Sequence, residues 1–393
     1  MLSKPEREQI IALIKREVVP AIGCTEPIAV ALCVAKAREI LGTEPEKVSA
    51  RLSANILKNA MGVGIPGTGM IGLPIAIALG ALVGRSEYQL EVLKDSDAKA
   101  VERGKRFIEQ GRIDISLKEG ITEKLYIEIE VSGGEQEAQG VELNLRKVFD
   151  FAMTTPLDEI RFILEAKRLN KAAAEDSFKN NYGHCVGNTL RHAPELRIIG
   201  DCALSRILSY TCAACDARMA GAMVPVMSNS GSGNQGIATT LPVVVYAEEI
   251  KADEEHLVRA LVLSHLTAIY IKQSLGRLSA LCGCVVAATG SSCGITYLMG
   301  GGYEAVSFAV KNMIANLTGM MCDGAKPSCS LKLMTGVSTA VLSAMLAMEN
   351  HSVSSVEGII DDDVDKSIRN LTLIGRDGMN ETDHLILKIM TSK

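Results

Sequence analysis

Three cysteines near the C-terminal end, Cys282, Cys322 and Cys329, lie in Gly- and Ser-rich segments, LCGCVVAATGSSCG and GMMCDGAKPSCSLK. Six residues separate Cys322 from Cys329, in a loop that contains Gly324 and Pro327. A loop of that length can fold back and bring two sulfurs to one metal centre. Three thiolates can hold an iron-sulfur cluster and leave one iron without a protein ligand. Because such an iron is a Lewis acid, these residues indicate Lewis-acid chemistry.

The third sulfur has two candidates, because Cys284 lies two positions after Cys282 and Gly283 between them allows close backbone approach. The spacing does not match a ferredoxin-type run, and buried, inert cysteines are the alternative interpretation. Cys212 and Cys215 form the single CxxC pattern, but no second CxxC and no suitably spaced histidine follow it. We interpret that pair as structural.

Cys24 lies in a GCTEP segment between two stretches, 5–20 and 27–41, whose apolar residues have helical spacing. A thiol at a helix N-terminus has a stabilised thiolate, so its pKa falls and it can act as a base or nucleophile near neutral pH. Glu26 works against that shift. The alternative interpretation makes Thr25 and Glu26 cap and first-turn residues, with Cys24 packed inside.

A Gly-rich loop at 230–236 lies in MSNSGSGNQGIATTLPV and is predicted to enter a helix. Its backbone N–H groups and hydroxyls would then cradle an anion, a carboxylate or a phosphate, at the positive end of the helix dipole. A plain flexible turn is the alternative. The candidate substrate-binding residues of this loop are Ser230, Ser232, Gly233, Asn234 and Gln235.

Asn55 and Lys58 precede a GVGIPG segment at 62–67. The segment matches the dinucleotide-binding fingerprint, but a proline lies inside it and no clear βαβ unit surrounds it. We interpret it as a tight turn near the active site and predict that Asn55 contacts the substrate. Lys58 is the residue that would form the Schiff base if the protein were instead a pyridoxal-phosphate enzyme.

The pattern of helices and strands that would position these residues predicts an α+β fold. Residues 1–88 and 201–393 are predicted to form a mainly α-helical cluster-binding, catalytic domain built from both ends of the chain. Residues 89–200 are predicted to form a smaller α+β domain with an antiparallel sheet. An apolar helix is predicted near 71–84, and a helical pattern returns at 156–172. β-like alternation is present at 48–57, 113–117, 124–131 and 141–148.

The composition narrows the function class. The chain has 393 residues, 47% of them hydrophobic, with 4% aromatic residues and no tryptophan, so we expect closely packed helices rich in small residues. The net charge is −5 and no basic stripe is present, so we expect a small substrate and no nucleic acid. The eleven cysteines show no disulfide pattern, and the sequence shows no secretory signal and no apolar run long enough to span a bilayer. We therefore predict a cytoplasmic protein that binds no membrane. A small-residue helical surface suggests a homodimer.

Four motifs taken together resemble the L-cysteine desulfidase family, which is related to the α-chain of iron-sulfur L-serine dehydratases. The resemblance runs from residue 10 to about residue 390. The motifs are GCTEPIAVAL at 23–32, SNSGSGNQG at 228–236, CGCVVAATGSSCGITYLMGG at 282–301 and GMMCDGAKPSC at 319–329.

The resemblance implies a [4Fe-4S] cluster held by three cysteines, and β-elimination of L-cysteine to pyruvate, ammonia and hydrogen sulfide without pyridoxal phosphate. The implied ligands are Cys282, Cys322 and Cys329, with Cys284 able to replace the first. Cys24 is the implied base that removes the α-proton. The alternatives are an iron-sulfur L-serine dehydratase, a pyridoxal-phosphate lyase, and a non-catalytic amino-acid-binding or cluster-sensor protein.

Overall fold

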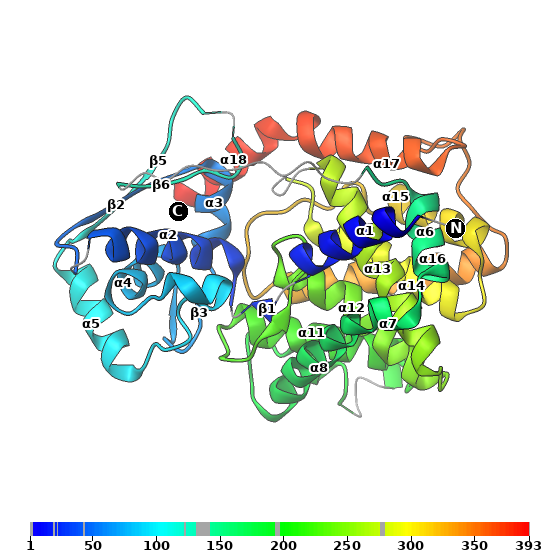
Figure 1. Cartoon of the computed structure of the whole chain (residues 1–393), viewed down its shortest axis with the longest axis horizontal. Coiled ribbons are helices and arrows are strands. Elements are labelled where there is room, and N and C mark those ends of the chain that lie inside the picture. The colour runs from blue at the N-terminus through cyan, green and yellow to red at the C-terminus, as the bar shows by residue number, and fades with distance from the viewer. Residues whose placement is uncertain are drawn as a thin grey trace.

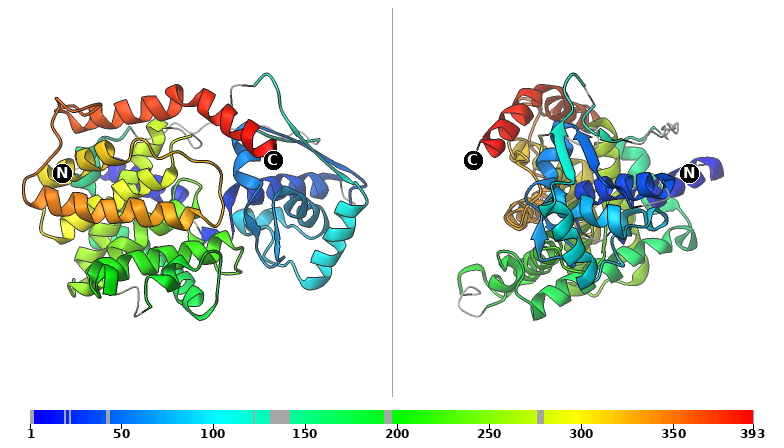
Figure 2. Two further views of the ribbon diagram at one scale, coloured as in Figure 1. Left: turned by 180° about the vertical axis from the view of Figure 1, so that it is seen from behind. Right: turned by 90° about the vertical axis from the view of Figure 1, so that its left-hand side faces the viewer.

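A computed structural model describes residues 3–392 except 19, 22, 42–43, 122, 131–141, 193–196 and 276–279. The described chain forms a sheet lobe, made by residues 23–130, and a larger helical lobe, made by α1 and the elements from α6 to α17 (Figure 1). The two lobes lie side by side along the long axis of the molecule, and the view from behind shows the same division (Figure 2, left).

The sheet lobe is built around a three-stranded mixed sheet in the order β5-β2-β6. The central strand β2 pairs in parallel with β5 and antiparallel with β6. The hydrophobic core of the sheet lobe lies between this sheet and the helices of the lobe, and it includes Val34, Leu52, Ile77 and Phe107. The elements are α2 (Thr25–Leu41), β2 (Val48–Leu52), α3 (Ala54–Ala60), β3 (Gly64–Ile65), β4 (Met70–Ile71), α4 (Leu73–Leu82), η1 (Ser86–Glu91), α5 (Ala98–Glu109), β5 (Ile113–Leu117) and β6 (Ile127–Ile129).

The helical lobe is a bundle in which α14 lies at the centre, packed against α12, α13, α15 and α16. The short strands β1 (Pro20–Ala21) and β7 pair antiparallel. The elements of this lobe and the C-terminal helix are α1 (Lys4–Glu17), α6 (Leu145–Thr154), α7 (Leu157–Ile160), η2 (Arg161–Ile163), α8 (Leu164–Lys179), α9 (Val186–Thr189), α11 (Ala203–Met219), β7 (Val226–Met227), α12 (Gly233–Glu249), α13 (Glu254–Leu275), α14 (Gly283–Leu298), α15 (Tyr303–Leu317), α16 (Cys329–Met348), α17 (Val364–Leu373), η3 (Ile374–Gly378) and α18 (Asn380–Thr391).

Small residues let the helices of this bundle approach closely, as the composition predicts. A Cβ added to Gly290 would lie 2.3 Å from the carbonyl oxygen of Ser264, and one added to Gly294 would lie 2.8 Å from that of Ala260. The backbones of α13 and α14 are therefore in direct contact at two levels, which larger side chains would prevent. This packing fixes the start of α14, where the CGC segment lies.

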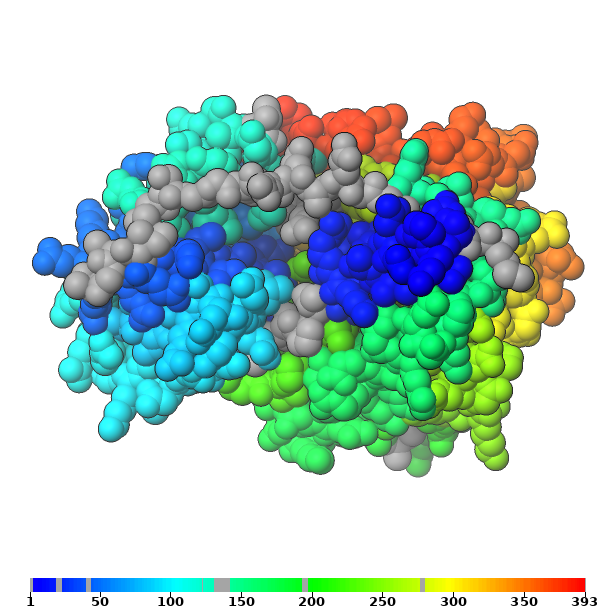
Figure 3. Space-filling view, viewed as in Figure 1, coloured from blue at the N-terminus to red at the C-terminus, as the bar shows by residue number. Residues whose placement is uncertain are grey.

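The two ends of the chain pack on different lobes. In the space-filling view α1 lies across the surface of the helical lobe (Figure 3), and its Ile10, Leu13 and Ile14 are buried in the main core. At the other end of the chain, α18 crosses to the sheet lobe and packs against α3 (Figure 2). Within the described helices α16 alone is long and apolar enough to cross a membrane, but it packs against α11, α14 and α15 in the bundle.

The structure confirms a mainly helical α+β fold with a small sheet, and it corrects details of the sheet. Strand β5 runs parallel to β2, so the sheet is mixed rather than antiparallel. The predicted strand at 141–148 is wrong, because Asn144 caps the backbone N–H of Lys147 and starts helix α6. Residues 131 and 141, which belong to two predicted strands, lie outside the described residues. The predicted domain boundaries stay a prediction, although β2, from the first segment, pairs with strands of the second.

Candidate active site

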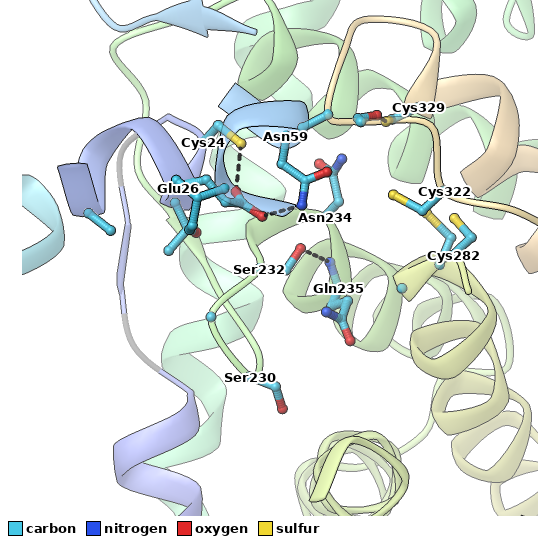
Figure 4. Close-up of a pocket in the computed structure, with 18 of the residues that line it drawn as sticks. Cys24, Glu26, Asn59, Ser230, Ser232, Asn234, Gln235, Cys282, Cys322 and Cys329 are labelled. Atoms are coloured by element: carbon cyan, nitrogen blue, oxygen red, sulfur yellow. Dashed lines mark hydrogen bonds between the residues drawn. The ribbon is translucent and has the colours of Figure 1, made fainter. Parts of the chain in front are cut away.

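A pocket at the junction of the two lobes draws its lining from both. The sheet lobe contributes the start of α2 and part of α3. The helical lobe contributes the end of α11, the loop before α12, the start of α14 and the loop that leads into α16. The free volume is about 240 Å³, which suits a small metabolite and excludes a polymer. Figure 4 shows the side chains that face into it.

The three predicted cluster ligands all line this pocket. Cys282 is the N-cap residue of α14, and Cys329 is the first residue of α16. The loop that carries Cys322 is held beside Cys282 by two backbone hydrogen bonds, Cys282 N to Met320 O at 3.0 Å and Cys322 N to Ala280 O at 2.6 Å. Cys282 and Cys322 lie next to each other in Figure 4, and Cys329 lies above them in the view.

The donor set fits an iron-sulfur cluster better than a single metal ion. Within the described ranges no three His, Cys, Asp or Glu side chains are close enough to hold one ion. In a cluster each thiolate binds a different iron, so its sulfur ligands stand farther apart than they would around one ion. Cysteine sulfurs in one pocket are the ligands such clusters use, and no histidine lines this pocket in the part of the chain that the structure describes.

The pKa values of the Cys282 and Cys284 thiols shift in opposite directions. A hydrogen bond from Cys284 lowers the pKa of Cys282 to about 7. The same hydrogen bond, together with burial, raises the pKa of Cys284 well above its ordinary value. Burial raises the pKa of Cys322 to about 11 and also raises that of Cys329. Both Cys282 and Cys284 line the pocket, so the choice of Cys282 as the third ligand stays a prediction.

Cys24 also lines the pocket, immediately before the first residue of α2, and only 1% of it is exposed. Its Sγ donates a hydrogen bond to Glu26 Oε2 at 3.0 Å, and Glu26 Oε1 accepts from Asn59 Nδ2 at 3.2 Å. Burial, and then the negative charge of Glu26, raise the pKa of the Cys24 thiol well above its ordinary value. The expectation of a lowered pKa is wrong, because burial and the neighbouring carboxylate outweigh the helix N-terminus.

The Gly-rich loop enters α12 as predicted, and Ser230, Ser232, Asn234 and Gln235 line the same pocket as the cysteines. Ser232 caps the helix by accepting from Gln235 N at 3.4 Å. The tight turn before the cap uses left-handed backbone at Ser230 (φ 49°) and at the glycine that follows it. Gly233 is the first residue of the helix.

A buried polar network around His265 supports the backbone just before this loop. Asn229 Nδ2 lies 3.1 Å from His265 Nδ1, and the hydroxyl of Thr240 lies 3.0 Å from His265 Nε2. His265 is fully buried, and this burial lowers its pKa to about 3. The ring is therefore neutral at physiological pH and fixes the backbone just before Ser230 through Asn229.

Asn55 and Lys58 are not among the residues that line the pocket. Both are buried on α3 and interact with Asp383 of α18: Asn55 Nδ2 donates to Asp383 Oδ2 at 3.0 Å, and Lys58 forms an ion pair with the same carboxylate. Lys58 also donates to the carbonyl of Cys322 at 3.3 Å. Asn55 thus contacts α18, and Asn59, one helical turn later, lines the pocket, so a substrate contact of Asn55 stays a prediction without support from the pocket geometry.

The CxxC cysteines, Cys212 and Cys215, are fully buried on α11 and do not line the pocket. The pocket residues that sequence reasoning missed include the polar residues Asn59, Arg218 and Lys272. The available signal for Arg218 was a single arginine in the small-residue stretch TCAACDARMAG. An arginine in a segment that is otherwise suited to the core needs a partner, and this one lies in the wall of the pocket.

A thiol-lined pocket with an adjacent thiol–carboxylate pair is compatible with an iron-sulfur lyase. Comparison with known families gives the same answer, because residues 87–388 match the family model of the serine dehydratase alpha chain. The match covers most of the chain, which therefore belongs to the family of iron-sulfur serine dehydratase alpha chains. The protein is therefore a lyase-type enzyme with a small-molecule substrate.

Close relatives extend the likeness to the first 86 residues, which contain Cys24 and Asn59. A UPF0597 protein of Bacteroides fragilis is 68% identical over the whole of both chains. One of Phocaeicola vulgatus is 70% identical over 100% of this chain and 99% of the relative. One of Oleidesulfovibrio alaskensis is 44% identical over 99% of both.

Proposed function

We propose that this enzyme is an L-cysteine desulfidase, which converts L-cysteine to pyruvate, ammonia and hydrogen sulfide with a [4Fe-4S] cluster on Cys282, Cys322 and Cys329. The observation that carries the proposal is that these three thiols line one pocket with the Cys24–Glu26 pair. Ligands for a Lewis acid and a group that can accept a proton then flank the same small space. β-Elimination needs both, one at the leaving group and one at the α-carbon.

The cluster, when bound, supplies a Lewis-acidic iron that stabilises the negative charge on the leaving sulfur. The chain's own residues handle the proton. Cys24 is a thiol that already donates to Glu26, so it can take the α-proton on Sγ only as its own proton passes to the Glu26 carboxylate. Asn59 holds that carboxylate from its other oxygen. Aminoacrylate leaves the pocket and hydrolyses to pyruvate and ammonia.

The loop before α12 completes the proposed site. Ser230, Ser232, Asn234 and Gln235 orient the substrate so that its Cα–H bond faces Cys24. The first N–H groups of α12 favour a negative charge at this point. A pyridoxal-phosphate mechanism through Lys58 has no support in the geometry, because that lysine is 1% exposed and ion-paired with Asp383.

The test is anaerobic purification, iron and acid-labile sulfide analysis, and assays of sulfide and pyruvate with L-cysteine and L-serine as separate substrates. About four iron and four sulfide per chain are expected, with sulfide released from L-cysteine. Faster pyruvate release from L-serine would replace the proposal with an L-serine dehydratase. An intact cluster without turnover of either would indicate a binding or sensor protein, and active protein without iron would reject the cluster.

Three variants test the assigned roles. Cys322→Ala should lose both iron and activity, whereas Cys24→Ala should keep the iron and lose turnover. Cys202→Ser is the matched control, because Cys202 is an exposed N-cap residue of α11 outside the pocket and serine is a good cap. Undiminished turnover in Cys24→Ala would remove Cys24 and the relay to Glu26 from the mechanism.

A further inference from the structure

Arg218, at the end of α11, is a buried cation in the wall of the pocket. Only 3% of the residue is exposed. Its Nη1 donates to Asn234 Oδ1 at 3.0 Å, and its Nε has no partner among the described residues. Asn234 is a neutral amide, and the ion pairs of the described chain include none with Arg218. Burying a charge without a counter-charge is unfavourable, so a group of this kind signals a missing anion.

The backbone beside Arg218 is shaped to hold the guanidinium at that position. A Cβ added to Gly233 would lie 2.1 Å from Arg218 Nε and 2.8 Å from its Cζ. The arginine therefore lies directly against the first residue of α12, where only a glycine leaves room. The guanidinium and the free N–H groups of that helix end place two sources of positive potential in the same corner.

Other polar atoms of the pocket lack partners as well. Asn59 Oδ1, Gln235 Oε1 and Thr25 Oγ1 are buried without a hydrogen bond in the described chain, and all three residues line the pocket. Buried polar groups are almost always paired in native proteins, so unpaired ones in one pocket indicate a ligand. The two amide oxygens accept hydrogen bonds and Arg218 donates them. An α-amino acid zwitterion, with its ammonium and carboxylate groups, complements that set.

We propose that Arg218 binds the α-carboxylate of the substrate, while the side-chain oxygens of Asn59 and Gln235 accept from the α-ammonium group. This assignment rests on the proposed function only for the substrate class, an α-amino acid, and holds for L-cysteine or L-serine alike. Arginine suits the task because its fork of N–H groups matches the two oxygens of a carboxylate. Arg218 is thus the residue that selects substrates with a free carboxylate.

The test measures binding separately from turnover, with anaerobically prepared, cluster-containing enzyme. The probe is L-alanine, which has no β-leaving group, and the matched probe is L-alaninamide, which lacks the carboxylate charge. The variants are Arg218→Gln, Arg218→Lys and Gly233→Ala. The control is Arg206→Gln, since Arg206 lies on the same helix but is 41% exposed in its side chain and pairs with Glu249 at the surface.

Wild-type enzyme should bind L-alanine at least about tenfold more tightly than L-alaninamide, because charged hydrogen bonds are lost with the amide. Arg218→Gln should weaken L-alanine binding roughly 10- to 100-fold and leave L-alaninamide binding within about threefold. Arg218→Lys should recover part of the difference, since it keeps the charge but not the fork. Gly233→Ala should show the same selective loss, and Arg206→Gln should match the wild type.

With L-cysteine, Arg218→Gln should raise KM more than it lowers kcat, because the carboxylate contact exists before and during the reaction. Circular dichroism and iron content check the fold of each variant, and Arg218→Lys decides the matter if Arg218→Gln does not fold. Equal binding of both probes by the wild type, or unchanged discrimination in folded Arg218 variants, overturns the assignment. If discrimination follows the prediction but no sulfide is released, the proposed function fails and Arg218 keeps its role.

Discussion

The buried ion pair between Lys58 and Asp383 should be one of the strongest single links between the sheet lobe and the C-terminal helix. The side chains are 1% and 8% exposed, so water screens their attraction little. Replacing Lys58 by methionine keeps most of the volume but leaves a buried carboxylate with Asn55 as its remaining side-chain hydrogen-bond partner among the described residues. Removal of one partner from such a pair costs about 3–5 kcal/mol, and we expect the free energy of unfolding to fall by that amount.

The link also reaches the candidate cluster site, since Lys58 Nζ donates to the carbonyl of Cys322. A Cβ added to Gly324 would lie 2.8 Å from the carbonyl oxygen of Lys58, so the cysteine loop and α3 are in direct backbone contact. Lys58→Met should therefore lower the iron content as well as stability. The assays are urea unfolding followed by circular dichroism, amide hydrogen exchange of α18, and iron analysis.

Two comparisons make the result decisive. The double variant Lys58→Met/Asp383→Leu removes both charges and should recover at least half of the loss, because a well-packed apolar pair replaces the ion pair at little cost. Lys366→Met breaks a solvent-exposed pair with Asp361 and should leave the free energy of unfolding close to that of the wild type. A loss below about 1 kcal/mol in Lys58→Met, or normal exchange protection of α18, would refute the reasoning.

Three further predictions follow from the thiols, the buried histidine and the expected assembly. Iodoacetamide at pH 7.5 should label the exposed Cys202, whose pKa is lowered by the Ser205 backbone N–H, well before it labels Cys24. Mass spectrometry of timed samples gives the order of labelling, and the reverse order would show that the burial argument is wrong. Because the pKa of His265 falls from about 6.5 to about 3 on folding, the unfolded state binds more protons in that range, so stability should decline as pH falls from about 6.5 to about 3. His265→Gln should reduce by up to one the number of protons taken up on unfolding in this pH range, so stability should depend less on pH. Urea unfolding at several pH values measures this dependence. Light scattering in solution tests the homodimer, which a mass of 41.9 kDa would contradict.

Local patterns in the sequence predicted the parts of the fold that depend on neighbours in the chain. The apolar spacing at 71–84 predicted α4, and the Gly-rich loop predicted the start of α12, because caps and periodicity act over a few residues. The strand at 141–148 failed for a local reason too, since Asn144 is a helix cap that the alternation obscured. The parallel pairing of β5 was not predictable from alternation, which is the same in both orientations.

The candidate site shows the same limit. Cysteine spacing and the Gly-rich loop identified the residues that line the pocket, because these segments carry little else that could explain them. The choice of Asn55 over Asn59 depended on which face of α3 meets the pocket, and that face is set by α18, more than 300 residues away. The pKa of Cys24 depended on its burial, which the helix-terminus argument left out.

The pocket is assembled from two lobes, so its chemistry depends on how closely the lobes meet. Cys24, Glu26 and Asn59 come from the sheet lobe, and the proposed cluster ligands come from the helical lobe. The lobes touch at Gly64, where an added Cβ would lie 2.6 Å from the carbonyl carbon of Ala220, two residues after Arg218.

A larger residue at Gly64 must therefore push the lobes apart at the edge of the pocket. Gly64→Val should keep the iron content, because the ligands lie on one lobe, but turnover should fall more than about tenfold as the proton acceptor withdraws from the α-carbon. Gly302→Ala, where an added Cβ meets nothing within 4 Å, is the control and should leave both unchanged. If folded Gly64→Val turns over substrate at the wild-type rate, the proton acceptor does not come from the sheet lobe, and the division of labour between the lobes is wrong.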